Sequence, residues 1–224
     1  MSLPQIAPST RKGDQVFEAM HTAIMSGELP AGHHLRIRDI ATQLGTSVMP
    51  VREAIRRLEE AGLAESLPHR GAVVKSLTPE ELLDIYAVRR LLKVEATTQG
   101  TAHATEEDIA AMEAELHTIE TALAQRRSVE YLDGDEHLLS ILYAASGNPV
   151  LLTTIETLWQ RCRPYKIVGV EGDQRSMDPS ELVKFQKSLI EAVRAGDASE
   201  ASAVTAASLD AAIERIHSAL DVPR

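Results

Sequence analysis

The chain has 224 residues, of which 44% are hydrophobic and 25% are charged, and its formal net charge at pH 7 is −10. This composition is typical of a globular protein, and no apolar run reaches the roughly 18 residues that a membrane-spanning helix needs. The N-terminal residues lack an apolar signal core and Cys162 is the only cysteine, so we expect a cytoplasmic protein with no disulfide and no membrane partner.

The charge is distributed unevenly along the chain. Residues 1–76 carry nine Lys and Arg against eight Asp and Glu, whereas residues 77–224 carry fourteen against twenty-five. Such asymmetry indicates two domains with different partners. We expect residues 1–11 to be flexible, residues 12–76 to form an N-terminal domain and residues 77–224 to form a second domain.

The N-terminal domain is predicted to contain three helices and a β-hairpin. Helical periodicity runs through residues 14–29, 36–45 and 45–63, and residues 63–77 suggest two short strands around the polar turn "PHRG". Two short helices joined by a turn that contains glycine form a helix-turn-helix unit. A hairpin after the last helix makes this a winged helix-turn-helix, in which the third helix enters the major groove of DNA.

The third helix has an apolar face and a basic face. Its apolar stripe consists of Val51, Ile55 and Leu58, while Arg52 and Arg56 lie four residues apart on another side. Ser47 is expected to cap its N-terminus. Taken alone, such a charged face is most often simply solvated, but within a helix-turn-helix it favours contact with DNA phosphates and bases.

The candidate DNA contacts are basic or polar residues near the third helix and at the tip of the hairpin. They are Arg36, Arg38, Thr46, Ser47, Arg52, Arg56, His69, Arg70 and Gly71. Arg57 belongs to the same basic cluster, but we expect it to form an intrahelical pair with Glu53 or Glu60 instead.

Residues 77–224 are predicted to be entirely helical. Thr78 and Thr105 are expected helix caps, and turns are expected at Gly147-Asn148-Pro149 and at Gly196-Asp197. The fold class is therefore mainly α: a winged helix-turn-helix followed by an antiparallel bundle of six or seven helices.

Two parts of the sequence resemble known families. "SGELPAGHHLRIRDIATQLGTSVMPVREAIRRLEEAGLAESLPHRGAVV" closely resembles the winged-helix domain of GntR-type bacterial regulators, although Val48 stands where relatives often have an arginine. The segments "VRRLLKVEA", "YLDGDEHLLSILYAASGNPVL" and "LIEAVRAGDASEASA" resemble, in order, the effector-binding FCD domain of the FadR subfamily.

The FCD resemblance implies a site within the helical bundle. Many relatives hold zinc or nickel through an Asp-x3-His pair and two later histidines; here the pair is Asp133 and His137, and the later positions are Gln186 and Ser208. Replacing two imidazoles weakens such a site, so these residues form either a weak metal site or a polar pocket that binds an effector directly. An ordinary i,i+4 contact is the remaining explanation for Asp133 and His137.

Two arginines complete the candidate effector site. Arg89 matches an arginine that often faces the effector cavity in relatives, and Arg163 is a further pocket candidate. Lys93 stands where the family pattern has a glutamate. Because an arginine in a cavity suits an anion, Arg89 favours a small carboxylate effector.

The resulting hypothesis is a homodimeric transcriptional regulator, most simply a repressor, which binds double-stranded operator DNA and responds to a small-molecule effector. One alternative is a regulator whose helical domain only dimerises and senses nothing. The other is a metal-dependent enzyme, which we do not expect because the sequence offers neither a nucleophile paired with a base nor a complete set of metal ligands.

Overall fold

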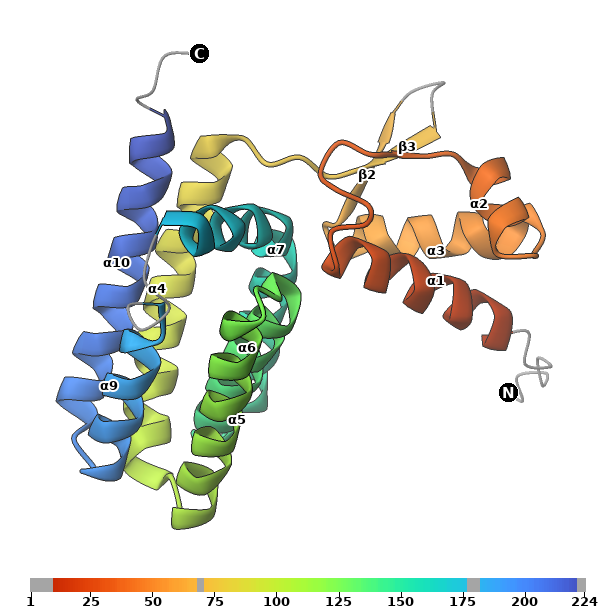
Figure 1. Cartoon of the computed structure of the whole chain (residues 1–224). Coiled ribbons are helices and arrows are strands. Elements are labelled where there is room, and N and C mark those ends of the chain that lie inside the picture. The colour runs from red at the N-terminus through yellow and green to blue at the C-terminus, as the bar shows by residue number, and fades with distance from the viewer. Residues whose placement is uncertain (1–9, 68–70, 177–181, 221–224) are drawn as a thin grey trace, which may run out of the picture. The chain divides into compact units, whose positions relative to one another are not determined.

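The computed structural model describes residues 10–67, 71–176 and 182–220 (Figure 1). The chain divides into two compact units, Met1–Ser76 and Leu77–Arg224. The described residues contain nine helices and one small sheet, which confirms the mainly α fold. No helix in these ranges is long and apolar enough to cross a membrane.

The first unit contains three helices and a three-stranded antiparallel sheet. In chain order its elements are α1 Thr10–Met25, β1 His34–Leu35, α2 Ile37–Gln43, α3 Val48–Glu60, β2 Ala64–Leu67 and β3 Gly71–Val74. The strand order is β1-β3-β2, so the predicted hairpin of β2 and β3 gains a third strand. Sequence analysis missed β1 because a two-residue strand is too short for alternation to be detected.

The core of this unit holds α3 in place. Val51, Leu58 and Ile24 of α1 are fully buried, and Leu35 and Val74 of the sheet are almost so. Gly45 adopts a positive φ of 59° in the turn between α2 and α3, which glycine accommodates without strain. The predicted helix-turn-helix is therefore present, with one face of α3 fixed against α1 and the sheet.

The second unit is a helical bundle. Its described helices are α4 Pro79–His103, α5 Glu106–Ala124, α6 Ser128–Ala144, α7 Pro149–Ser176, α9 Lys184–Arg194 and α10 Ala198–Leu220. Thr78 and Thr105 both form complete capping boxes, with Glu81 and Asp108 respectively, as the sequence predicted for the two threonines.

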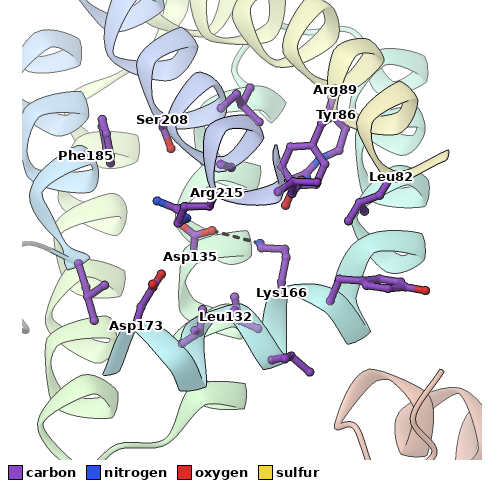
Figure 2. A pocket seen from close by; sticks show the side chains of 18 of the residues that line it. Leu82, Tyr86, Arg89, Leu132, Asp135, Lys166, Asp173, Phe185, Ser208 and Arg215 are labelled. Atoms are coloured by element: carbon purple, nitrogen blue, oxygen red, sulfur yellow. Dashed lines mark ion pairs between the residues drawn. The ribbon is translucent and has the colours of Figure 1, made fainter. Parts of the chain in front are cut away.

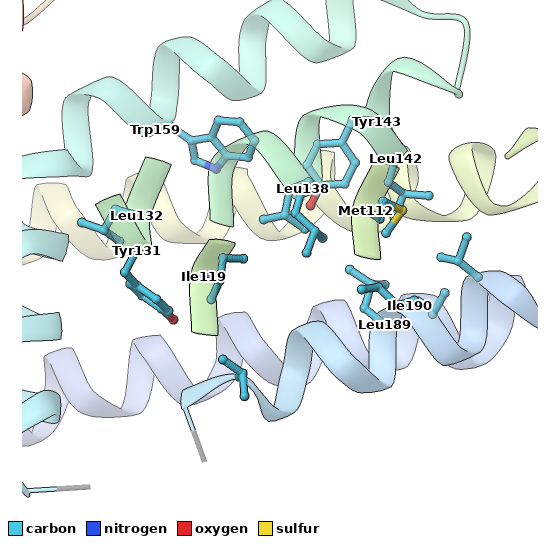
Figure 3. Packing of buried hydrophobic residues seen from close by; sticks show 14 of the residues in the cluster. Met112, Ile119, Tyr131, Leu132, Leu138, Leu142, Tyr143, Trp159, Leu189 and Ile190 are labelled. Atoms are coloured by element: carbon cyan, nitrogen blue, oxygen red, sulfur yellow. The ribbon is translucent and has the colours of Figure 1, made fainter. Parts of the chain in front are cut away.

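The bundle is organised around α6. Leu138, Leu142 and Tyr143 of this helix are fully buried among side chains of α5, α7 and α9 (Figure 3). Gly100 lets α4 approach α6 closely, because a Cβ at this position would overlap the backbone carbonyl oxygen of Leu142. The N-terminal halves of α4 and α6 line a pocket together with residues of α7, α9 and α10.

Candidate functional site

The exposed side of α3 is the first candidate surface. Val51, Ala54, Ile55 and Leu58 are buried, and the opposite side of the helix carries Met49, Arg52 and Arg56. Ser47 occupies the N-cap position but makes no cap hydrogen bond through its side chain, so the expectation of a side-chain cap was wrong. Its hydroxyl therefore lies exposed at the positive end of a helix, where phosphate oxygens are favoured.

The arginines of α3 differ in their partners. Arg56 pairs with Glu53 at 2.5 Å and also with Glu60, and its hydrogen bond lowers the pKa of Glu53. Arg57 instead pairs with Asp14 of α1 at 2.8 Å and lies 3.9 Å above the Phe17 ring. The predicted intrahelical pair thus belongs to Arg56 and not to Arg57.

Arg52 is the freest cation of this helix. It is exposed, and no ion pair joins it to another described residue. Arg57 does not add to the exposed basic face, because its side chain contacts Asp14 and Phe17 on α1. A basic side chain without an intramolecular ion pair can bind a phosphate or a base without first breaking an existing contact.

The remaining DNA candidates lie around α3. Arg36 and Arg38 are exposed, and Arg36 lies 3.9 Å from Asp39 in a loose surface pair. Gly71 begins β3 with a φ of 86°. His69 and Arg70 lie outside the described residues, and Thr46 is half-buried in the turn before α3. Their contacts with DNA stay a prediction.

The second candidate site is a pocket of about 470 Å³ within the bundle (Figure 2). One part of its wall is polar, formed by Arg89 and Lys93 of α4, Asp135 of α6, Lys166 of α7, Gln186 of α9 and Ser208 of α10. The other part is mainly apolar and includes Leu77, Leu82, Leu132, Leu182, Phe185, Leu209 and Ile216. Its size and mixed lining are those of a small-molecule site.

Arg89 is the most unusual group in the pocket wall. Its side chain is 2% exposed and its guanidinium lies 4.5 Å from the centre of the Tyr86 ring. Its Nε and Nη1 atoms have no hydrogen-bond partner among the described residues. Buried donors are nearly always paired in folded proteins, with protein atoms, ordered water or a ligand, so these two donors mark Arg89 as a candidate contact for a bound molecule.

Two other polar residues of the pocket, Gln186 and Lys166, contact the carboxylate of Asp135. Gln186 Nε2 donates to Asp135 Oδ1 at 2.8 Å, and Lys166 Nζ lies 3.5 Å from Asp135 Oδ2. Burial opposes ionisation of Asp135, but Lys166 and Lys93 outweigh it and lower the pKa of this carboxyl. Lys93 is 7% exposed, and burial together with Arg89 lowers its pKa to about 7.

The structure does not bring together the four residues expected to hold a metal. Gln186 and Ser208 line the pocket, but Asp133 and His137 lie on the solvent side of α6. Two residues along a helix correspond to more than half a turn, so Asp135 faces inward where Asp133 faces outward. The expectation of a site at Asp133 and His137 was therefore wrong, and Asp135 is the carboxylate of the pocket.

The pocket residues do not suit a divalent metal. Asp135 contacts Gln186, and its negative charge is stabilised by the nearby ammonium groups of Lys166 and Lys93. An ammonium group repels a metal ion, and an amide and a hydroxyl are weak ligands for zinc or nickel. Within the described ranges, no group of three or more His, Cys, Asp and Glu side chains is placed to hold a metal.

Arg163 is a structural residue and not a pocket residue. Its guanidinium is buried and pairs with Asp133 and, at 2.8 Å, with Glu136, so its expected role in effector binding was wrong. Sequence analysis missed Asp135 and Lys166. Asp135 carried a signal, since it interrupts the apolar stripe of Leu132, Leu139 and Leu142 at helical spacing.

Comparison with known proteins identifies both units. Residues 12–74 match the family "Bacterial regulatory proteins, gntR family", and residues 84–211 match the FCD domain. The Escherichia coli regulator McbR is 26% identical over 168 residues, which cover 75% of this chain and 74% of McbR. A Paenarthrobacter nicotinovorans protein, "Probable D-xylose utilization operon transcriptional repressor", is 40% identical over 84 residues, 38% of this chain and 37% of that protein.

Solved structures agree with this fold. The structure of E. coli McbR/YncC superposes with a TM-score of 0.78 at 23% sequence identity, covering 97% of this chain and 100% of that one. A GntR regulator from Rhodococcus sp. RHA1 gives a TM-score of 0.80, also at 23% identity, with coverage of 96% and 100%. The chain therefore belongs to the GntR family of DNA-binding transcriptional regulators, in the FadR-like subfamily whose second domain is an FCD effector-binding domain.

Proposed function

We propose that this regulator is a cytoplasmic homodimeric repressor whose affinity for operator DNA changes when an organic carboxylate binds beside Arg89. The observation that carries the proposal is the pair of buried, unpartnered donors on the Arg89 guanidinium. A carboxylate accepts two parallel hydrogen bonds from a guanidinium, and both become stronger away from water.

The charges around the pocket favour an anion. Four cationic side chains line the pocket against two carboxylates, Asp135 and Asp173; the cations are Arg89, Lys93, Lys166 and Arg215. The lowered pKa of Lys93 reduces this excess of positive charge. A bound carboxylate would supply the missing negative charge and would favour the protonated form of Lys93.

The shape of the pocket favours an acid with an apolar body. The carboxylate end would lie at Arg89, which stacks on Tyr86, while leucines, Phe185 and Ile216 would surround the rest of the ligand. Burying that apolar body contributes affinity in proportion to its area. The proposed effector is thus an amphipathic carboxylic acid and not a highly charged or sugar-like molecule.

The pocket includes the first residues of the helical unit. Leu77 and Pro79 line it, and the Leu77 amide donates to the hydroxyl of Tyr165, another lining residue. Only residues 75–78 separate β3 of the DNA-binding unit from α4. To bind DNA, the two DNA-binding units of a dimer must reach half-sites about 34 Å, one helical turn, apart. A ligand that favours one position of Leu77 would change the population of the arrangement with this spacing.

The alternative of a helical domain that only dimerises predicts a closed interior. The pocket of about 470 Å³, with an unpartnered arginine in its wall, favours the sensing function instead. Repression, as opposed to activation, is supported by the P. nicotinovorans relative, which is described as a repressor.

The test compares acids with their uncharged analogues. Thermal unfolding of the full-length protein would be measured with a panel of aliphatic and aromatic carboxylic acids and with the corresponding primary amides. We expect some acids, but not their amides, to raise the Tm and to change DNA affinity, and we expect Arg89→Met to remove both effects. Arg90→Met is the matched control, because Arg90 is a partly exposed arginine on the same helix and pairs with Asp210 at 2.6 Å. Stabilisation by an acid that persists in Arg89→Met would contradict the proposed site.

A further inference from the structure

We propose that Met49 and Val48, in the first turn of α3, contact thymine methyl groups in the major groove, so that each operator half-site carries T·A base pairs opposite this turn. The inference rests on the proposed placement of α3 in the major groove. It adds that two apolar residues determine which base pairs are preferred. Neither residue was among the basic and polar candidates for DNA contact.

The two side chains are exposed although nothing in the fold requires them to be. Met49 is 68% exposed and lies on the side of α3 opposite the buried stripe, and Val48 is 39% exposed beside it. An isolated exposed apolar residue is common on protein surfaces and needs no explanation. Two adjacent ones at the N-terminal turn of a recognition helix are different, because this turn is where helix-turn-helix proteins contact base edges.

The turn that carries Met49 and Val48 is held rigidly. Val51, in the same turn, is fully buried, and the amide of Thr46 donates to the carbonyl of Ala41 at 2.9 Å, which fixes the entry to α3. Arg52 is exposed one turn further along, and Arg38 is exposed on the preceding helix α2. These cations suit the phosphates on either side of a groove, so a duplex is the partner whose charge matches this surface.

The chemistry of the groove then selects the base. Thymine presents a C5-methyl group there, which is the one large apolar feature among the four base-pair edges. A methionine or valine placed against guanine or cytosine would instead exclude water from hydrogen-bonding atoms that it cannot satisfy. Met49, being unbranched and polarisable, can adapt to a methyl group at slightly different positions.

The experiment begins with the selection of binding sites from random duplex DNA by the full-length protein. In the selected site, each thymidine is then replaced in turn by deoxyuridine, which lacks only the methyl group. We expect one or two positions in each half-site where this replacement weakens binding by about fourfold, the value that corresponds to one buried methyl group.

Variants assign those positions to residues. Met49→Ala or Val48→Ala should abolish the sensitivity to deoxyuridine at the position that each residue contacts. Val150→Ala, at a 74% exposed site on α7, is the control and should retain it. Val48→Arg should shift the selected base pair at its position from T·A to G·C, because arginine binds the guanine edge.

Two results would overturn the inference. One is a selected half-site in which deoxyuridine is tolerated at every position, and the other is a deoxyuridine effect that is equal in the wild type, Met49→Ala and Val48→Ala. A selection that enriches no sequence at all would instead refute the DNA-binding role of α3, and the inference with it. Failure of the carboxylate assay would leave the result unaffected.

Discussion

Two buried arginines of the helical unit allow a direct test of whether Arg89 binds a ligand or stabilises the fold. Arg89 and Arg163 are 2% and 3% exposed, and Arg163 forms ion pairs with Asp133 and Glu136, whereas no ion pair joins Arg89 to another described residue. Replacing each by methionine keeps the length of the side chain and removes its donors. The ligand-free protein should respond in opposite directions.

The magnitudes follow from the partners of each group. Without a bound acid, each of the two unpartnered donors of Arg89 costs about 1–3 kcal/mol, and the stacking on Tyr86 offsets about 0.5–2 kcal/mol of this. Arg89→Met should therefore stabilise the unit by about 2 kcal/mol. Arg163→Met should destabilise it by about 3 kcal/mol, the lower end for a broken buried pair, because Asp133 is half exposed.

Thermal and urea unfolding of the full-length variants, without added acid, would measure these changes. For a unit of this size, 1 kcal/mol corresponds to about 2–4 °C in Tm, so the two variants should differ by about 10 °C or more. If Arg89→Met lowers the Tm as much as Arg163→Met does, Arg89 is a structural residue with a partner in solution, and the argument for an anion site fails.

Three further predictions concern charge and coupling. Since the pKa of Lys93 is lowered to about 7, the folded state binds fewer protons than the unfolded state above that pH. The contribution of Lys93 to the unfolding free energy should thus rise with pH from about 7 to 8.5, and Lys93→Met should remove this slope in urea titrations. Arg52→Ala should cost about 1–3 kcal/mol of DNA-binding free energy and Arg56→Ala less, because Arg56 is already paired; fluorescence anisotropy at several salt concentrations would show this. Tyr165→Phe should reduce the ratio of DNA affinities measured with and without an acid identified in the thermal assay, because it releases the start of α4.

Features that depend on neighbouring residues were predictable from the sequence. The capping boxes at Thr78 and Thr105 need only residues one turn apart, and the apolar stripe of α3 follows from its own periodicity. The hairpin of β2 and β3 was likewise predictable, but β1 was not, because its two residues become a strand only by pairing with β3.

Features that depend on which side of a helix faces the interior were harder to predict. Asp133 and His137 are correctly spaced to lie on one side of α6, but packing turns that side to the solvent and places Asp135 in the pocket. In the same way, helical spacing allows either Arg56 or Arg57 to pair with Glu53. Asp14 on α1 decides the outcome, and the sequence gives no indication of that contact.

The carboxylate that α6 contributes to the pocket is already paired with protein groups. Lys166 and Gln186 both contact Asp135, and Lys166 supplies positive charge beside it. Arg89, on α4, has buried donors without a partner among the described residues. The same helix carries Lys93 and begins within the pocket, directly after the segment that leads from β3. In the proposed mechanism, a ligand at Arg89 would act directly on the helix that follows the linker from the DNA-binding unit, so the coupling would not depend on a long chain of intermediate contacts.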